Sequence, residues 1–384
     1  MILTLGFPNK PALVFKSTGH VLPVTDTECR PGITAAFETD WTKVNTTLWS
    51  CIRLAGEQAS EGKSRGDQEE QAISYLHYLL LARPDLHVAH GLLTRKDTIT
   101  FFLGIGGYGV RSFKIPWTSR KVYRLMYAFV YRLYEPGDFA DPSYVKIVPN
   151  WKKNIATYTV RITKTEGGGV ETTIECPNFE PIYASNPFET RTHILSNPSS
   201  EVKINDKVLT VLKDQLCRLE TQFNEHVILN HIHDQGKVPG VVEPVYHESI
   251  TIPPFLPDSK RKEKHRIGLV QLGKPFSTIT TLRQMLDIVF DILEGALISI
   301  DTVLSAHLFP VLRYLRVNRQ VLHRDISKGN IVYIEDDAPP RSPISDAGSL
   351  LTPDAGPSGA GEAKGKSLCF IKYLLGERHV INML

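Results

Sequence analysis

The segment from His323 to Asn330 is the most constraining stretch of the chain. It reads His-Arg-Asp-Ile-Ser-Lys-Gly-Asn, with Asn330 five positions after Asp325. In a chain of this composition, a chance match to one fixed pattern of four residues has a probability of roughly a few in a thousand. An ordinary polar loop between two apolar segments is the alternative. The spacing instead favours a site in which the aspartate accepts a hydroxyl proton and the asparagine turns back to hold a magnesium ion.

Length and composition are those of a soluble globular protein. The chain has 384 residues, of which 42% are hydrophobic and 22% charged, and its formal net charge is +3. Such a length allows two domains or one large one. The small excess of positive charge gives no reason to expect a nucleic-acid partner. The densest basic run, residues 260–266, is interpreted as a solvated loop after a proline-rich stretch, in preference to a nuclear-import signal.

Cysteine content and hydropathy bear on the compartment. The five cysteines lie far apart and form no Cys-x-x-Cys pair, which favours free thiols in a reducing compartment and no structural zinc. Residues 1–14 lack the basic and apolar regions of a signal peptide. Acidic residues interrupt the longest apolar stretch, residues 285–300, so we expect a buried helix there and no membrane span. These features predict an intracellular protein of the cytoplasm or nucleus.

Residues 1–180 have an α+β pattern in which the sequence identifies no chemistry. A capping-box signal at Asp67 opens one helix, and an apolar stripe marks a second. Three glycines, Gly167 to Gly169, form the turn of a hairpin with alternating strands on either side. The predicted elements are a helix from 67 that stops before Pro84, a hairpin of 92–94 and 98–103, a helix over 119–134, and a hairpin of 158–163 and 170–174.

After residue 181 strands and helices alternate until the His323 segment. The predicted elements are a strand over 208–213, a helix that carries Leu219, Phe223 and Val227 and ends near Gly236, strands over 241–252 and 266–271, and a buried helix from Thr281. Residues 337–366 mingle proline with glycine, serine, alanine and aspartate. Such a composition buries too little apolar surface to offset the entropy of ordering, which predicts a disordered insertion. A strand-like stretch, residues 368–375, follows it.

Lys213 and Glu225 are the candidates for a phosphate-binding ion pair. Thr210 to Lys213 resembles a Val-Ala-Ile-Lys motif at a strand end, and the period of two puts Val211 and Lys213 on one face, where a nucleotide can lie. Glu225 follows twelve residues later on the next predicted helix, and Glu220 is the second choice. A solvated lysine at the end of a strand is the alternative interpretation.

Two segments are candidates for a phosphate-binding loop. Residues 104–109 contain Gly-x-Gly-x-x-Gly but lie too far before Lys213, and no helix opens after them, so a turn between strands is predicted. Residues 186–206, where such a loop should lie, contain no glycine. This predicts weak or altered nucleotide binding, with Thr190, Arg191 and Thr192 as substitute donors. The histidines upstream of His323 show no ligand spacing.

Taken together, these segments resemble the fungal-type protein kinase domain family. The residues that carry the resemblance are 321–331 around His-Arg-Asp, Leu272 to Phe276, Thr210 to Lys213, and the insertion that precedes residues 370–375. The resemblance implies an α+β, protein-kinase-like bilobal fold with an incomplete helical lobe. Residues 1–180 would form an N-terminal α+β extension, 181–270 the N-lobe and 271–384 the start of the C-lobe.

The same resemblance implies the cofactors and the roles of the site residues. ATP and Mg2+ would be bound, and the γ-phosphoryl group would pass to a serine or threonine hydroxyl of a protein substrate. Asp325 would be the catalytic base, Asn330 a magnesium ligand, Lys213 the phosphate anchor beside Val211, and Glu225 its partner.

The sequence also departs from the family. No Asp-Phe-Gly motif follows Asn330, and the activation segment is absent. These departures predict a truncated gene model with little or no kinase activity. Two alternatives stay open: a pseudokinase that acts as an interaction scaffold, and a small-molecule phosphotransferase, against which Arg324 argues.

Overall fold

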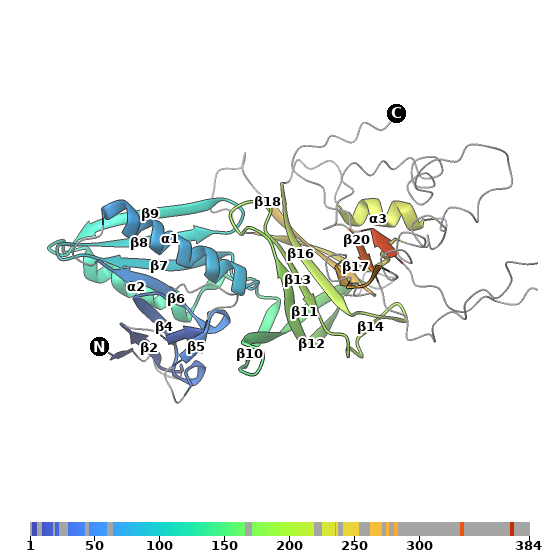
Figure 1. Cartoon of the computed structure of the whole chain (residues 1–384), viewed down its shortest axis with the longest axis horizontal. Coiled ribbons are helices and arrows are strands. Elements are labelled where there is room, and N and C mark those ends of the chain that lie inside the picture. Colours follow the sequence, from blue (N-terminus) through green and yellow to red (C-terminus); the bar gives the residue numbers. More distant parts are fainter. Residues whose placement is uncertain are drawn as a thin grey trace, which may run out of the picture. The chain divides into compact units, whose positions relative to one another are not determined.

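Figure 1 shows a computed structural model of the chain. The structure describes residues 2–5, 10–17, 20–22, 30–42, 46–59, 64–165, 171–218, 225–234, 236, 241–252, 262–270, 274–275, 280–282, 331–333 and 369–371. The chain has two compact units, residues 1–226 with 244–271 and residues 227–243 with 272–384. Strands and helices both occur in these ranges, so the fold class is α+β, as predicted. Among the described helices, none combines the length and apolar character that a membrane crossing requires.

A seven-stranded sheet forms the first part of the larger unit. Its strand order is β1-β2-β4-β6-β7-β8-β9. Neighbours are antiparallel except β6 and β7, which are parallel because a helix, α1, connects them. The strands are β1 (Ile2–Leu5), β2 (Leu13–Lys16), β4 (Ile33–Phe37), β6 (Leu54–Gln58), β7 (Val88–Thr94), β8 (Thr98–Ile105) and β9 (Gly109–Pro116).

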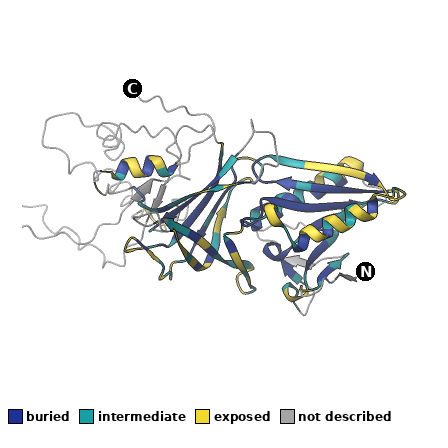
Figure 2. Cartoon of the chain, turned by 180° about the vertical axis from the view of Figure 1, so that it is seen from behind, coloured by how far each residue is buried: buried dark blue, intermediate teal, exposed yellow. Residues whose placement is uncertain are grey.

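Two helices, α1 (Arg65–Ala82) and α2 (Val122–Tyr134), cover opposite faces of this sheet. Neighbouring strand residues point to opposite faces, and Phe101 and Phe102 of β8 show this. Phe102 joins the core cluster of Leu76 on α1, whereas the ring of Phe101 lies 4.9 Å from that of Phe129 on α2. Figure 2 shows both helices with a buried side toward the sheet and an exposed side away from it.

A second seven-stranded sheet follows in the same unit, with the order β10-β11-β12-β13-β16-β18-β17. All its neighbours are antiparallel. The sheet curls so that its second strand approaches its last one. The amide of Thr163 on β11 donates to the hydroxyl of Tyr246 on β17 at 3.1 Å. The strands are β10 (Tyr144–Asn150), β11 (Ile155–Thr165), β12 (Glu171–Ala184), β13 (Thr192–Ser196), β16 (Val211–Arg218), β18 (Lys262–Leu269) and β17 (Pro244–Thr251).

Short elements complete the described part of the chain. In the larger unit they are β3 (His20–Leu22) parallel to β5 (Thr46–Leu48), the hairpin β14 (Lys203–Ile204) and β15 (Lys207–Val208), and the turns η1 (Glu38–Asp40), η2 (Trp49–Cys51) and η3 (Gly137–Phe139). Helix α3 spans Glu225–His233. The smaller unit has an antiparallel sheet of β19 (Lys274–Pro275), β20 (Ile331–Tyr333) and β21 (Cys369–Ile371).

The C-terminal end of α1 is held by side chains of the second sheet. The last carbonyls of a helix lack partners within the helix. Arg191 donates to the carbonyls of Leu80 at 3.0 Å and Arg83 at 2.6 Å, and also to that of Leu86. The Tyr158 hydroxyl donates to Ala82 at 2.8 Å, and His193 Nε2 lies 3.1 Å from the carbonyl oxygen of Leu81. These contacts join the two sheets at buried polar groups.

The prediction of a solvated loop for the basic run is wrong for residues 262–266, which begin β18. Lys264 and Arg266 are buried because two carboxylates neutralise them. Lys264 Nζ lies 2.6 Å from Asp141 and 2.7 Å from Asp214, and Arg266 binds both oxygens of Asp214 at 2.7 and 2.8 Å. Burial alone would raise the pKa of Asp214, but the charges of Arg266 and Lys264 outweigh it and hold that pKa well below its usual range.

Several predicted elements are present with shifted ends. The first hairpin is β7 and β8, and the 158–174 hairpin is β11 and β12, whose turn lies outside the described residues. Helix α1 begins two residues before Asp67, because the Ser64 hydroxyl accepts from the Asp67 amide at 3.1 Å and so caps it. Strand β16 starts at Val211 and continues to Arg218, beyond the predicted end at Lys213. Strand β12 runs across position 180, where the sequence predicted a boundary between the N-terminal extension and the N-lobe. The apolar stretch 285–300 and the insertion 337–366 lie outside the described residues.

Replacing Arg191 by lysine should destabilise the larger unit by about 2–4 kcal/mol. A lysine ammonium cannot reach all three carbonyls, and each buried carbonyl left without a donor costs about 1–3 kcal/mol. Urea denaturation should show the lower free energy of unfolding. The matched control is Arg161→Lys on the exposed Arg161–Glu175 pair, which should change the free energy by less than about 1 kcal/mol. Equal losses in the two variants would contradict the capping role of Arg191.

Acid should destabilise the fold through His193. Burial, followed by the nearby charges of Arg191 and Lys264, lowers the pKa of His193 from 6.5 to about 3. Below pH 6.5 His193 therefore binds a proton in the unfolded chain but stays neutral in the folded chain. This difference lowers the free energy of unfolding by about 2 kcal/mol by pH 5. His193→Gln keeps a donor for Leu81 and should reduce proton uptake on unfolding by about one, measured from the slope of stability against pH. The exposed His231→Gln is the control; an unchanged slope in His193→Gln would refute the assignment.

Candidate functional site

Lys213 lies in the middle of the second sheet rather than at a strand end. It is the third residue of β16, which pairs with β13 on one side and β18 on the other. Only 2% of Lys213 is exposed, and Val211, on the same face, is 3% exposed. The interpretation of Lys213 as a solvated strand-end lysine is therefore wrong. A buried ammonium group needs a counter-charge.

The counter-charge of Lys213 is Glu225, the first residue of α3. The ammonium group and Oε2 of Glu225 form a hydrogen-bonded ion pair, and the two side chains are 3% and 8% exposed. The structure thus brings together the two residues that the spacing of twelve had selected. Glu220, the second choice, lies outside the described residues. The pair ties a central strand to the start of a helix.

Cys217 stands on the same face of β16 as this ion pair and supplies no nucleophile. Burial, and next the negative charge of Glu225, raises the pKa of the Cys217 thiol to about 11. The reactive form of a cysteine is the thiolate. At neutral pH the group is therefore an inert thiol, which leaves the Lys213–Glu225 pair beside it for binding chemistry.

The glycine-free turn between β12 and β13, residues 185–191, is closed by its own hydrogen bonds. The Phe188 amide donates to Asn186 Oδ1 at 3.1 Å, and the Glu189 amide to the Asn186 carbonyl at 3.3 Å. Ser185 accepts at its hydroxyl from the Thr192 amide at 2.7 Å. These amides are not directed at a ligand. The proposal of Arg191 as a substitute phosphate donor is also wrong, since its guanidinium binds carbonyls at the end of α1.

The Gly-x-Gly-x-x-Gly segment is a turn between strands, as predicted, because it connects β8 to β9. Gly107 has a φ of +78°, a left-handed conformation that glycine adopts without strain. Its amide donates to the Pro187 carbonyl at 2.7 Å. A Cβ on Gly106 would lie 2.9 Å from Nη1 of Arg191, so this position needs glycine for a close approach. The glycines therefore serve packing between two turns.

The residues of the His-Arg-Asp segment lie outside the described part of the chain. Asp325 and Asn330 have no described position, and the described residues resume at Ile331, where β20 begins. Their roles as catalytic base and magnesium ligand stay predictions.

Three histidines that sequence spacing did not single out come together on the face of the sheet that carries Lys213. They are His226 of α3, His247 of β17 and His265 of β18, and one ring nitrogen from each lies within 4.8 Å of the others. Burial lowers the pKa of His226 to about 4, and burial and the neighbouring rings do the same for His247. The rings are thus neutral at pH 7. The β17–β18 register brings His247 and His265 together, and the periodicity of the sequence does not predict that register.

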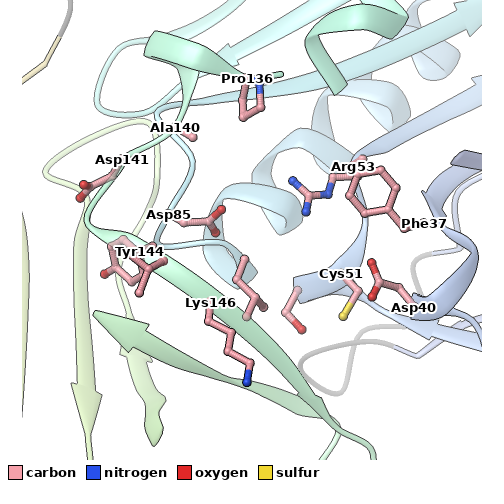
Figure 3. A pocket seen from close by; sticks show the side chains of 13 residues that line it. Phe37, Asp40, Cys51, Arg53, Asp85, Pro136, Ala140, Asp141, Tyr144 and Lys146 are labelled. Atoms are coloured by element: carbon pink, nitrogen blue, oxygen red, sulfur yellow. The ribbon is translucent and has the colours of Figure 1, made fainter. Parts of the chain in front are cut away.

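A cavity of about 330 Å3 lies elsewhere in the larger unit (Figure 3). Arg53 extends into it toward Asp85, and Cys51 lies next to Asp40. The carboxylate of Asp85 is already bound on both oxygens by Arg83, at 2.8 and 2.6 Å. Burial, and then the charge of Asp40, raises the pKa of the Cys51 thiol to about 11, which removes it as a nucleophile. Neither Asp85 nor Cys51 is therefore an activated group for catalysis in this cavity.

Removing one partner of the Lys213–Glu225 pair should cost far more than removing both. Lys213→Met or Glu225→Gln alone leaves one buried polar or charged group without its partner, at a cost of about 3–5 kcal/mol. In the double variant both groups are neutral, so its loss should be well below the sum. The coupling free energy from a double-mutant cycle, measured by urea denaturation, checks this. Additive single effects would contradict a direct, buried ion pair.

Comparison with known proteins does not place the chain in a family. No protein-family model matches the sequence. No curated protein matches it either.

Proposed function

We propose that the chain is an ATP-binding phosphotransferase of the protein serine/threonine kinase type, with a kinase-like bilobal fold. The observation that carries the proposal is the buried ion pair between Lys213 on a central strand and Glu225 at the start of the next helix. Protein kinases place a lysine of one strand and a glutamate of the following helix in this relation, and both must be in place for phosphoryl transfer. The His323–Asn330 segment supplies the second, independent support.

The ion pair performs a definite task in this proposal. Lys213 would hold the nucleotide phosphates, and Glu225 would fix the direction of its ammonium group. Val211, two residues before Lys213 on the same face, would offer the apolar surface against which a base can lie. A lysine fixed by a buried carboxylate is pre-organised, so less rotamer entropy is lost when a phosphate binds.

The His-Arg-Asp segment would provide the remaining groups. Asp325 would accept the proton of the substrate hydroxyl. The hydroxyl oxygen would bond to the γ-phosphorus while the bond between this phosphorus and the leaving ADP oxygen breaks. Asn330 offers one amide oxygen, the ligand type that Mg2+ prefers, and this ion takes its other ligands from phosphates and water. Bound Mg2+ would neutralise charge on the phosphates. The residues of this chain position the nucleotide and remove the proton.

A second candidate is a pseudokinase that uses the fold as an interaction scaffold. The observation in its favour is the 185–191 turn. It contains no glycine, and its amides at Phe188 and Glu189 are bound within the turn. Backbone amides that are already paired cannot cover nucleotide phosphates. Nucleotide binding without transfer, or no nucleotide binding, would follow from this arrangement.

Mg-ATP should raise the thermal unfolding midpoint of the full chain, and Lys213→Met should weaken binding at least about 10-fold, a loss of about 1.4 kcal/mol. The Lys213→Met/Glu225→Gln double variant keeps the buried site neutral and separates binding from stability. Lys203→Met, which removes an exposed lysine, is the control and should bind as the unchanged chain does. Isothermal titration calorimetry provides the dissociation constants. No heat and no thermal shift with Mg-ATP would overturn the proposal.

A transfer assay on the same proteins separates the two candidates. Transfer of the γ-phosphoryl group to a generic protein substrate that disappears in Asp325→Asn supports the kinase. Binding of Mg-ATP without any transfer supports the scaffold. Transfer to sugars or amines with none to proteins would identify a small-molecule phosphotransferase instead.

A further inference from the structure

We propose that His226, His247 and His265 form a binding site for a transition-metal ion of the Zn2+ class. The site lies on the face of the second sheet that carries Lys213. It consists of three imidazoles from three different elements, α3, β17 and β18. Nothing in the proposed phosphotransfer reaction uses these side chains, so the site is a separate property of the chain.

The register of two strands explains why two of the histidines meet. Strands β17 and β18 pair so that Ser249 lies opposite His265 and His247 lies opposite Ile267. His247 and His265 are therefore diagonal neighbours on one face, at a separation that long side chains can span. The third histidine, His226, is the second residue of α3, and its ring stacks on that of His247.

The distances fit a shared ion. His247 Nε2 and His265 Nδ1 are 3.2 Å apart. Zinc–nitrogen bonds of about 2.0–2.1 Å at tetrahedral angles separate two ligand nitrogens by about 3.3 Å. The donor atoms of all three rings lie within 4.8 Å of one another, and the set would close on an ion once the ring of His226 turns out of its stack on His247.

A carboxylate fixes the tautomer that a ligand requires. His265 Nε2 lies 3.3 Å from Oε2 of Glu263, two residues earlier on the same face of β18. A proton on Nε2 that points at Glu263 leaves the Nδ1 lone pair facing both His247 Nε2 and the Ser249 hydroxyl, each 3.2 Å away. Metal-binding histidines typically donate their other ring N–H to a carboxylate in this way.

His226 presents a buried polar atom that no other described residue pairs with. Its Nδ1 is buried and has no hydrogen-bond partner within the described residues. A buried nitrogen without a partner costs free energy, and a metal ion would satisfy it. Three imidazoles with no carboxylate or thiolate in the set favour Zn2+, Cu2+ or Ni2+ over Mg2+ or Ca2+, which prefer oxygen. Three protein ligands leave one tetrahedral position open.

The site has a structural consequence for Glu225. His226 follows Glu225 directly, so an ion held by His226, His247 and His265 would clamp the first turn of α3 to β17 and β18. This clamp would hold the carboxylate of Glu225 against Lys213. The metal would thereby order the ion pair without contacting it.

Zinc titration of the full chain tests the proposal. After chelator treatment and dialysis, calorimetry should show one Zn2+ bound per chain, and zinc should raise the thermal unfolding midpoint. His247→Asn and His265→Asn should each abolish the tight binding, whereas His231→Asn, an exposed position on α3, should leave it unchanged. Substitution with Co2+ should give the visible absorption of a tetrahedral nitrogen site, which both ligand variants lose.

Two further variants keep the test decisive. Glu263→Gln lies at a partly exposed position, should fold, and should weaken zinc binding about 10–100-fold. Lys203→Met, at an exposed position of β14 outside both proposed sites, should bind zinc as the unchanged chain does. No stoichiometric zinc binding by the unchanged chain, or binding that persists in the His247→Asn/His265→Asn double variant, would overturn the assignment.

Discussion

The buried charges of Asp141, Asp214, Lys264 and Arg266 determine how the second sheet can be assembled. Asp214 lies opposite Arg266 in the β16–β18 register, while its neighbour Lys213 lies opposite Ile267 and faces the other side. A shift of one residue would move every side chain of β16 to the opposite face. It would bury Lys213 beside two cations and turn Asp214 toward Glu225. The four-charge cluster therefore penalises the wrong register, and it places the Lys213–Glu225 pair and the three histidines on one face. Buried ion pairs often add little to stability, so we ascribe to this cluster a role in specifying the pairing.

Polar contacts also unite the two sheets of the larger unit. Asp141 precedes β10, yet it neutralises cations of β18, more than a hundred residues later in the chain. Arg191 and His193 reach from the second sheet to carbonyl groups at the end of α1. The Asp141 contacts thus close the second sheet on itself, whereas those of Arg191 and His193 connect it to the helix that packs on the first sheet. Residues 1–226 thus form one compact unit with 244–271, and no single sequence motif predicts this unit.

Local patterns predicted local structure well, and long-range partners poorly. The hairpin at Arg95 to Asp97 and the helix of Leu76 followed from turn residues and apolar spacing. The Lys213–Glu225 pair followed from a spacing of twelve between a strand and the next helix. A charge run such as the one around Lys264 and Arg266 predicts a solvated segment, and only the register against β16 reveals the carboxylates that pair with them. The convergence of His247 and His265 depends on the same kind of register. For Asp325 and Asn330 the sequence motif is the whole of the argument.

The pairing of β20 with β21 has a consequence for the length of the chain between them. Tyr333 lies opposite Cys369, so the two ends of the 334–368 segment are held side by side. Once two ends are fixed in this way, the entropy of closing the connection grows only with the logarithm of its length, about 0.6 kcal/mol for each doubling. A few residues added to a connection of this length would therefore cost the Tyr333–Cys369 pairing little. The same property makes it a suitable place to insert an affinity tag or a reporter domain.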